Sequence, residues 1–256
     1  MNFINSFLSS LPMYILSLPV LLLAFSVHET AHGYVACKLG DPTARNLGRL
    51  TLNPIKHIDP IGFICMMVFH VGWAKPVPIN TRYFKNPKRD MALTGAAGPL
   101  SNLALALIHL VLLRVVMLFA SDAYVDDAFM FISTGNKGSL AFTLMSLVVY
   151  LLYLGIIINI SLAIFNLIPI PPFDGSRIFY AFLPTNLYFK VMKYERIIML
   201  VMLVLFATGF LSTTISWLLS YIVGGGLFVT GLDRGQDGSV LAVMITYIQK
   251  LLTITL

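Results

Sequence analysis

The chain has few charged residues and few cysteines, and each shortage excludes a class of protein. Only 11% of its 256 residues are charged, whereas 58% are hydrophobic, and the mean hydropathy is +0.86. A soluble domain of this length could not bury so much apolar surface in one core. The two cysteines, Cys37 and Cys65, provide neither a disulfide framework nor a Cys-x-x-Cys zinc spacing. The composition therefore predicts a multi-pass membrane protein.

Four apolar stretches are each long enough to cross about 30 Å of hydrocarbon. They cover approximately residues 11–37, 91–114, 140–168 and 194–222. The first basic residue of the chain is Lys38, so the first stretch lacks the basic region that begins a secretory signal peptide. We therefore expect this stretch to persist as a membrane helix.

Positive charge is concentrated between the first and the second predicted helix. Nine Lys or Arg residues lie from Lys38 to Arg89, against two aspartates, whereas the loop 121–138 carries three aspartates and a single lysine. Under the positive-inside rule the basic stretch is cytoplasmic, and the acidic loop and the N-terminus are external. The basic residues consequently require no nucleic-acid partner.

The segment between these two helices is neither a full span nor an ordinary loop. Residues 60–72 are apolar but too few to cross, which is typical of a re-entrant or interfacial segment. Residues 50–52 resemble a short strand, and prolines favour an extended chain at 73–78. We expect these extended segments either to pair with an extended strand of another chain or only to connect the helices along the membrane surface.

The first predicted helix contains the segment His28-Glu29-Thr30-Ala31-His32. Residues four apart share one helix face, so both histidines can present a ring nitrogen to one Zn²⁺. Glu29 directly follows the first histidine, where a carboxylate can act as general base for a zinc-bound water. The motif could also occur by chance, but ionisable groups at membrane depth are costly and usually mark function.

A zinc site of this kind needs a third protein ligand, and the chain contains only two glutamates, Glu29 and Glu195. Glu195 lies in the charged entrance of a predicted helix, where a solvated salt bridge is the better interpretation. Further nitrogen ligands are available, although a packed or interfacial role is favoured for each of them: His57, His70 and His109.

Asp174 is the stronger third ligand because of where the topology places it. The predicted helix 140–168 ends on the cytoplasmic side, at the same level as His32. Three prolines then break the helix, and Asp174 follows them directly before a glycine. Together with the two histidines, this carboxylate would leave zinc a fourth position for water, as a catalytic site requires.

Three motifs occur together in the chain: residues 28–32, Gly98-Pro99-Leu100-Ser101-Asn102, and residues 166–175. Their combination resembles the site-2 protease family of intramembrane zinc metalloproteases. The connection between the first two helices also resembles that of compact prokaryotic members without PDZ or CBS domains. The resemblance implies one catalytic Zn²⁺ bound by His28, His32 and Asp174, with Glu29 activating water.

The resemblance also gives a meaning to the asparagines within the predicted helices. A buried amide can donate to a substrate carbonyl or to a developing oxyanion, and we predict this role for Asn166 and Asn102. The alternative is a hydrogen bond that only joins helices, and this interpretation is favoured for Asn159.

These observations predict an all-α polytopic membrane protein, a bundle of about four to six transmembrane helices with a short re-entrant or β-like segment between the first two spans. Residues 1–222 would form the metalloprotease core, and residues 223–256 a C-terminal segment whose topology the sequence leaves open. The expected location is a prokaryotic inner membrane, with the active site toward the cytoplasm.

The predicted function is zinc-dependent cleavage of a peptide bond in or near the transmembrane segment of a membrane protein. The expected partners are this transmembrane substrate and the lipid bilayer, with a homo-oligomer or a regulatory membrane partner as further options. Two alternatives belong to other classes, a membrane zinc transporter and a non-catalytic scaffold that binds helices. The external halves of the helices offer almost no ligands for a transport path, and the intact Glu29 argues against a scaffold.

Overall fold

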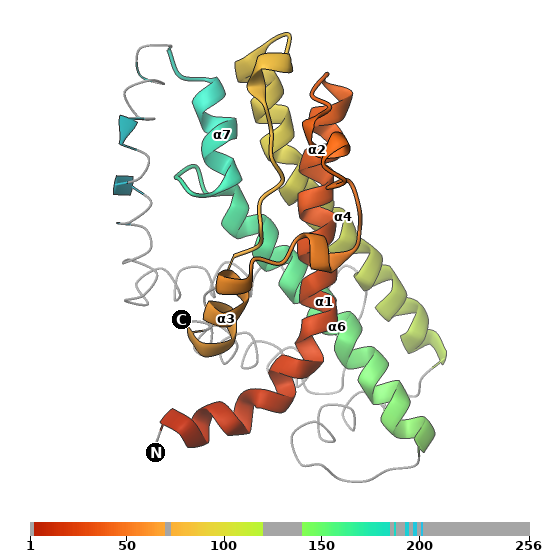
Figure 1. Cartoon of the computed structure of the whole chain (residues 1–256). Coiled ribbons are helices and arrows are strands. Elements are labelled where there is room, and N and C mark those ends of the chain that lie inside the picture. Colours follow the sequence, from red (N-terminus) through yellow and green to blue (C-terminus); the bar gives the residue numbers. More distant parts are fainter. Residues whose placement is uncertain are drawn as a thin grey trace.

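A computed structural model describes most of the first 184 residues and a few positions beyond them. The described residues are 3–69, 73–119, 140–184, 187, 193, 194, 197, 198 and 201. Within this part of the chain the structure is helical and contains no β-strand. Three long helices dominate it, namely α1 (Phe3–Lys38), α4 (Pro87–Phe119) and α6 (Leu140–Leu167) (Figure 1).

Each long helix contains a stretch that is long and apolar enough to cross a membrane. These stretches are Ile15–Lys38, Pro87–Leu118 and Thr143–Leu167. They confirm the first three predicted membrane helices and the all-α class. The fourth predicted helix, 194–222, lies almost entirely outside the described residues, as do Glu195 and the segment 223–256.

Helix α4 packs against both α1 and α6. Its contact with α6 is an apolar core to which α4 contributes Ala106 and Leu113, and α6 contributes residues such as Tyr153. At one point the helices come so close that a Cβ on Gly155 would collide with the ring of His109. Small residues let the backbones of membrane helices approach this closely. Such contacts matter because helices in lipid associate through close packing, without the hydrophobic driving force that acts in water.

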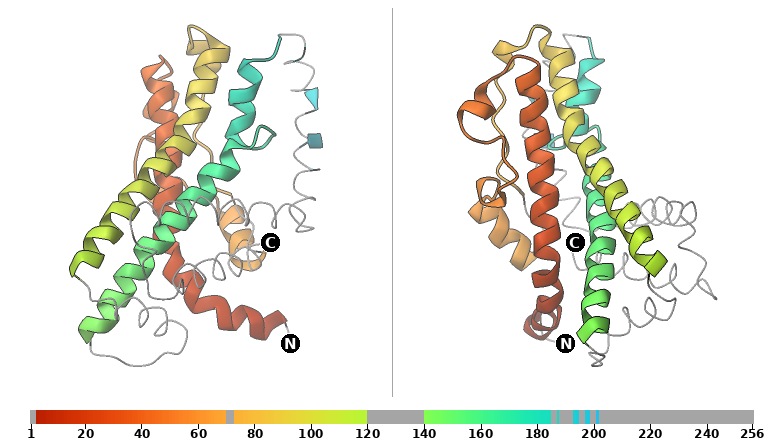
Figure 2. Two further views of the ribbon diagram at one scale, coloured as in Figure 1. Left: turned by 180° about the vertical axis from the view of Figure 1, so that it is seen from behind. Right: turned by 90° about the vertical axis from the view of Figure 1, so that its right-hand side faces the viewer.

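The connection between α1 and α4 is a chain of short helices and irregular segments. It contains α2 (Thr43–Asn46), η1 (Pro54–Lys56), α3 (Pro60–Phe69) and η2 (Thr81–Tyr83). In Figure 2 this connection covers one side of α1, and α4 covers the other. Helix α1 is therefore enclosed by regular structure on one side and by irregular chain on the other.

The strand expected at residues 50–52 is not present among the described residues. The extended pairing lies elsewhere in the connection, as an isolated antiparallel bridge between Ile58 and Ala74. Helix α3 has ten residues, in agreement with a segment too short to cross a bilayer. Its re-entrant or interfacial position stays a prediction.

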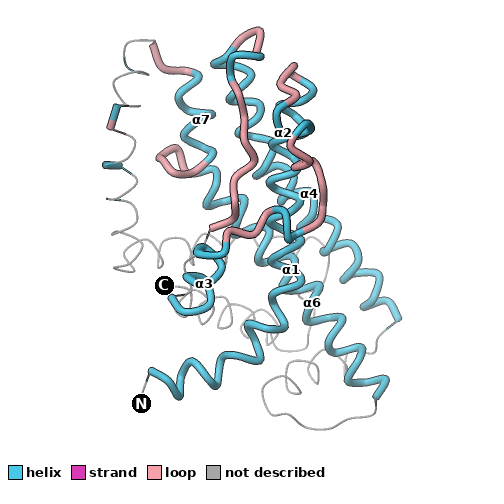
Figure 3. Tube along the Cα trace, in the orientation of Figure 1, coloured by secondary structure: helices cyan, strands magenta, loops and turns pink. Residues whose placement is uncertain are grey.

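The end of α6 leads through a short turn into α7 (Asp174–Ala181). Gly175 lies directly against the carbonyl groups of Leu167 and Ile168, where no Cβ would fit. The C-terminal end of α1, the N-terminal end of α4 and the start of α7 thus lie in the same half of the bundle (Figures 1 and 3). This arrangement agrees with the topology from which Asp174 was predicted to lie near His32.

Candidate metal centre

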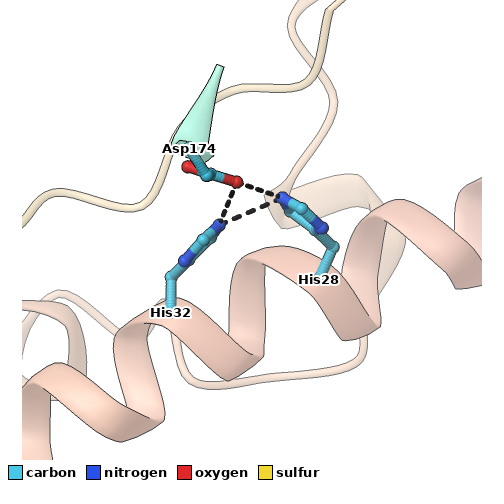
Figure 4. Close-up of side chains that lie close together, drawn as sticks. All are labelled: His28, His32 and Asp174. Carbon is cyan, nitrogen blue, oxygen red and sulfur yellow. Dashed lines mark hydrogen bonds and ion pairs between the residues drawn. The ribbon is translucent and has the colours of Figure 1, made fainter. Parts of the chain in front are cut away.

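The structure brings together His28, His32 and Asp174 from two helices. Both histidines lie on α1 and are 6% exposed, and Asp174 is the first residue of α7. The two Nε2 atoms are 3.0 Å apart, and each lies 3.1 Å from Oδ2 of Asp174 (Figure 4). Three ligand atoms therefore converge on one small volume, as the sequence predicted for these residues.

The second nitrogen of each histidine is held by an oxygen on α4. His28 Nδ1 lies 2.5 Å from Oδ1 of Asn102, and His32 Nδ1 lies 2.7 Å from the carbonyl oxygen of Thr94. A carbonyl oxygen can only accept, so Nδ1 of His32 carries its proton and donates it there. In the neutral ring, Nε2 of His32 then presents a lone pair toward Asp174.

The chemistry of this donor set fits a divalent metal ion. A neutral imidazole nitrogen and a carboxylate oxygen 3.1 Å apart repel each other unless a cation lies between them. Tetrahedral zinc with ligands at about 2.0 Å places those ligands about 3.3 Å apart. The observed separations of 3.0 to 3.1 Å are close to that value. Two nitrogens and one carboxylate oxygen are also the ligand types that zinc accepts in catalytic sites.

Helix α4 can approach the two histidines only because residue 98 is glycine. A Cβ at this position would collide with the imidazole rings of both His28 and His32. Pro99 follows within the same helix and removes the backbone donor to the carbonyl of Gly95. The Gly-Pro pair of the second motif thus lies directly behind the metal centre.

Asp174 is prepared to act as an anionic ligand. Burial raises the pKa of its carboxyl, but hydrogen bonds and positive charge from His28 and His32 in their protonated forms more than offset burial. The pKa therefore lies below its ordinary value. Since the group is ionised at neutral pH, it needs no proton release before it binds a cation.

Glu29 lies on a different face of α1 from the two histidines. Its carboxylate is half-buried, and Oε2 accepts a hydrogen bond of 2.7 Å from the backbone N–H of Val77. Gly33, one turn later, is covered by side chains of Leu50 and Val77. The connection, rather than a helix, thus fixes the position of Glu29.

The other predicted residues occupy several places. Asn102 is fully buried beside His28, whereas Asn166 is half-buried near the end of α6 and donates to the carbonyl of Leu162 at 2.9 Å. His57 donates instead to the carbonyl of Thr51 at 2.7 Å, and His109 packs between α4 and α6. Neither of these two histidines belongs to the cluster. His70 and Glu195 lie outside the described residues.

Three groups at the site were not predicted from the sequence. They are the carbonyl of Thr94, the missing side chain of Gly98 and the backbone N–H of Val77. Two of them are backbone groups, a carbonyl that every residue carries and an N–H that every residue except proline carries, so residue type could not have indicated them. The Gly-Pro pair was visible in the sequence, but its contact with the histidine rings depends on how α1 and α4 pack.

The comparisons with known proteins agree with this geometry. Residues 16–209 match the model of peptidase family M50. YwhC of Bacillus subtilis (strain 168), named as a candidate zinc metalloprotease, is 41% identical over 201 residues, which are 78% of this chain and 83% of the relative.

Two more distant relatives carry the same kind of name. Rip2 of Mycolicibacterium smegmatis is 27% identical over 174 residues, 66% of this chain and 57% of the relative. MJ0611 of Methanocaldococcus jannaschii is 28% identical over 170 residues, 66% of this chain and 71% of the relative. No solved structure matches the chain. The chain belongs to peptidase family M50, the site-2 protease family, and is an integral membrane zinc metalloprotease.

Proposed function

We propose that this protein cleaves a peptide bond in or near the transmembrane segment of a membrane protein. The observation that carries the proposal is the position of the site. His28, His32 and Glu29 lie within a helix stretch that is apolar enough to cross a membrane, and Asp174 contacts the two histidines from α7. Ionisable groups at such a depth are costly and are retained for function.

His28, His32 and Asp174 would hold the zinc ion. When bound, zinc polarises a carbonyl group and makes water a stronger nucleophile at neutral pH. Glu29 takes a proton from the attacking water and delivers it to the nitrogen of the departing amine. Because Val77 already holds Oε2 of Glu29, the other carboxylate oxygen is left to accept that proton.

Asn166 is proposed to donate its amide to the oxygen of the scissile carbonyl. It is half-buried and lies within the motif that leads to Asp174. Its present bond to the carbonyl of Leu162 must break, which is a small cost because that carbonyl also belongs to the helix ladder. Asn102 stays a prediction for the same role, although its amide is engaged with His28, Asn159 and Ala24.

A transmembrane substrate must unwind before hydrolysis, because helical carbonyls are hydrogen-bonded and shielded. We propose that residues 50–52 and 73–78 hold the unwound chain. Support comes from the carbonyl of Thr51, which accepts bonds of 2.7 Å from both Thr30 and His57 and fixes this segment against α1. The side chain of Leu52, next to this anchored carbonyl, is exposed.

The active-site half of the bundle is proposed to face the cytoplasm of a prokaryotic cell, with the N-terminus external. The excess of basic residues between Lys38 and Arg89 supports this orientation. Single cysteines at Lys85 and Asp126, in a background without Cys37 and Cys65, should label from opposite sides of the membrane. Labelling of both from the same side would contradict the orientation.

The function itself is tested with purified protein in lipid nanodiscs and single-span membrane substrates. We expect cuts in or next to the substrate span, located by mass spectrometry, that stop with a zinc chelator and return with added Zn²⁺. The His32→Ala variant serves as the control for contaminating proteases. Cleavage only in soluble loops far from the span, or cleavage that survives His32→Ala, would refute the proposal.

A further inference from the structure

Three buried polar side chains on three different helices form a continuous network at the metal centre. Asn102 on α4 and Asn159 on α6 are both fully buried, and His28 on α1 is 6% exposed. Asn102 Oδ1 lies 2.5 Å from His28 Nδ1, and Asn102 Nδ2 donates to Oδ1 of Asn159 at 2.8 Å. The network thus joins the core between α4 and α6 to a predicted metal ligand.

Two backbone carbonyls fix the direction of every bond in this network. Asn159 faces the carbonyl oxygen of Gly155 at 2.8 Å, so the amide nitrogen of Asn159 must point there. Its oxygen therefore faces Asn102. Asn102 also lies 3.3 Å from the carbonyl oxygen of Ala24, which again can only accept. The contacts with Asn159 and with Ala24 both require the amide nitrogen of Asn102 to face them, so the amide oxygen of Asn102 faces His28.

The consequence falls on the tautomer of His28. Since Asn102 presents an oxygen, Nδ1 of His28 must carry the proton and donate it. In the neutral ring the lone pair is then on Nε2, the atom that lies 3.1 Å from Asp174. In the opposite tautomer, Nε2 of His28 would carry a proton where the metal is expected. The lone pair of Nδ1 would then face a lone pair of Asn102 Oδ1, and the two would repel each other.

We propose that Asn102 is a positioning residue of the metal centre, which holds His28 in the tautomer and orientation that offer Nε2 to zinc, and that Asn159 in turn orients Asn102. This inference rests on the metal site proposed above. Outer partners of metal-bound histidines contribute about 10- to 100-fold to metal affinity. His32 has its own outer partner in the Thr94 carbonyl, so the network acts on His28 alone.

The proposed role differs measurably from that of an oxyanion donor. A donor to the substrate contributes to turnover and leaves zinc binding unchanged. A positioning residue contributes to zinc binding and needs only an acceptor toward His28. Asn102→Asp keeps an acceptor toward His28 and loses only the amide donor toward Asn159 and the carbonyl of Ala24. Asn102→Leu has a similar size and loses both groups.

The experiment measures Zn²⁺ affinity of the purified protein in detergent by competition with a fluorescent zinc chelator. We expect Asn102→Leu to bind Zn²⁺ about 10- to 100-fold more weakly, Asn102→Asp to stay within about threefold of wild type, and Asn159→Leu to lose less than Asn102→Leu. The matched control is Ser146→Ala, which removes another buried polar group from α6 whose hydroxyl has no hydrogen-bond partner among the described residues. This control should leave Zn²⁺ affinity unchanged.

Wild-type Zn²⁺ affinity in Asn102→Leu, or an equal loss in the leucine and aspartate variants, would overturn the inference. If circular dichroism shows that Asn102→Leu has lost its helical structure, the test rests on Asn102→Asp alone. A fall of more than tenfold in the Zn²⁺ affinity of Asn102→Asp then overturns the inference. His32→Ala separates this question from the metal site itself. Unchanged Zn²⁺ affinity in His32→Ala would refute the ligand set and the inference together, whereas a strong loss there beside wild-type affinity in Asn102→Leu refutes the positioning role only.

Discussion

The two faces of α1 are built in opposite ways around the same short motif. One face, the metal face, carries the proposed ligands His28 and His32 and is covered by α4 and α7, whose side chains and carbonyls are fixed by the helices. The other face carries Glu29 and Thr30 and is covered by irregular chain, through backbone groups of Val77 and Thr51. One face depends on helix packing and the other on the course of a loop.

This difference indicates that the proposed metal ligands and the proposed base can be disturbed separately. Helix packing is rigid and deeply buried, so it suits a site that must keep its ligands within a few tenths of an ångström. Loop segments are easier to displace, and an enzyme that admits a polypeptide next to its base requires such a segment. The variants of the protein proposed below alter one face while leaving the other in place.

The largest effect is expected from Asp174→Ala, which removes a ligand from the metal face. Zinc affinity should fall by more than about 100-fold, which exceeds the loss expected when a residue that only hydrogen-bonds to a metal-bound histidine is removed. Cleavage should be abolished. Glu195→Ala is the matched control, because it removes the other acidic residue considered as a third ligand. Metal analysis of both purified variants decides the question. The opposite pattern would move the ligand to Glu195.

A smaller but still large effect is expected from Gly98→Ala on the same face. The added methyl group would collide with both imidazole rings, and a shift of about 1 Å around a catalytic site costs about 100-fold in rate. Gly95→Ala is the graded comparison one turn earlier, where the nearest atoms, Cβ of Arg177 and the backbone oxygen of Asp174, would lie 3.1 and 3.2 Å away and must give by only a few tenths of an ångström. Equal cleavage rates for these two variants would show that α4 does not define the site.

The metal face was largely predictable from sequence, because its signals are residue types at fixed spacing. His28 and His32 are one helical turn apart, and Asp174 follows a proline-rich break at the end of another predicted membrane helix. Both features follow from helix geometry and membrane topology alone. The groups that hold the Nδ1 atoms of the two histidines were harder to predict. The roles of Thr94 and Asn102 depend on how α4 is rotated relative to α1, which the sequence does not specify.

A moderate effect is expected on the other face from Val77→Pro, which removes the N–H that holds Glu29. Loss of one hydrogen bond to a charged group should lower kcat about tenfold while zinc content stays at the wild-type level. Val77→Ala keeps this N–H and serves as control for the loss of packing on Gly33. If Val77→Pro and Val77→Ala turn over equally fast, the N–H of Val77 does not position the base.

The smallest effect concerns the substrate that the irregular face is proposed to receive. Replacement of glycine or asparagine by leucine near the end of a substrate span that is proposed to reach the site should slow cleavage about three- to fivefold per residue, because leucine raises the cost of unwinding. Rates are compared within a substrate series of constant span length. Equal rates throughout the series would show that unwinding does not limit selection.

The irregular face was less predictable than the metal face. The sequence indicated an extended segment and a short apolar segment there, and α3 agrees with the latter. It placed a strand at residues 50–52, whereas the pairing occurs between Ile58 and Ala74. Extended segments without a regular hydrophobic alternation carry little information on their register, so the contact between Val77 and Glu29 could not be anticipated.

The separation of the two faces is tested most directly by Glu29→Gln, measured for zinc content and cleavage on the same purified sample. The amide cannot accept a proton from water, yet the three proposed ligands are untouched. We expect about one zinc per chain, as in the wild type, and cleavage slower by about 10²- to 10⁴-fold. Cleavage near the wild-type rate, or loss of the zinc together with the activity, would contradict the account.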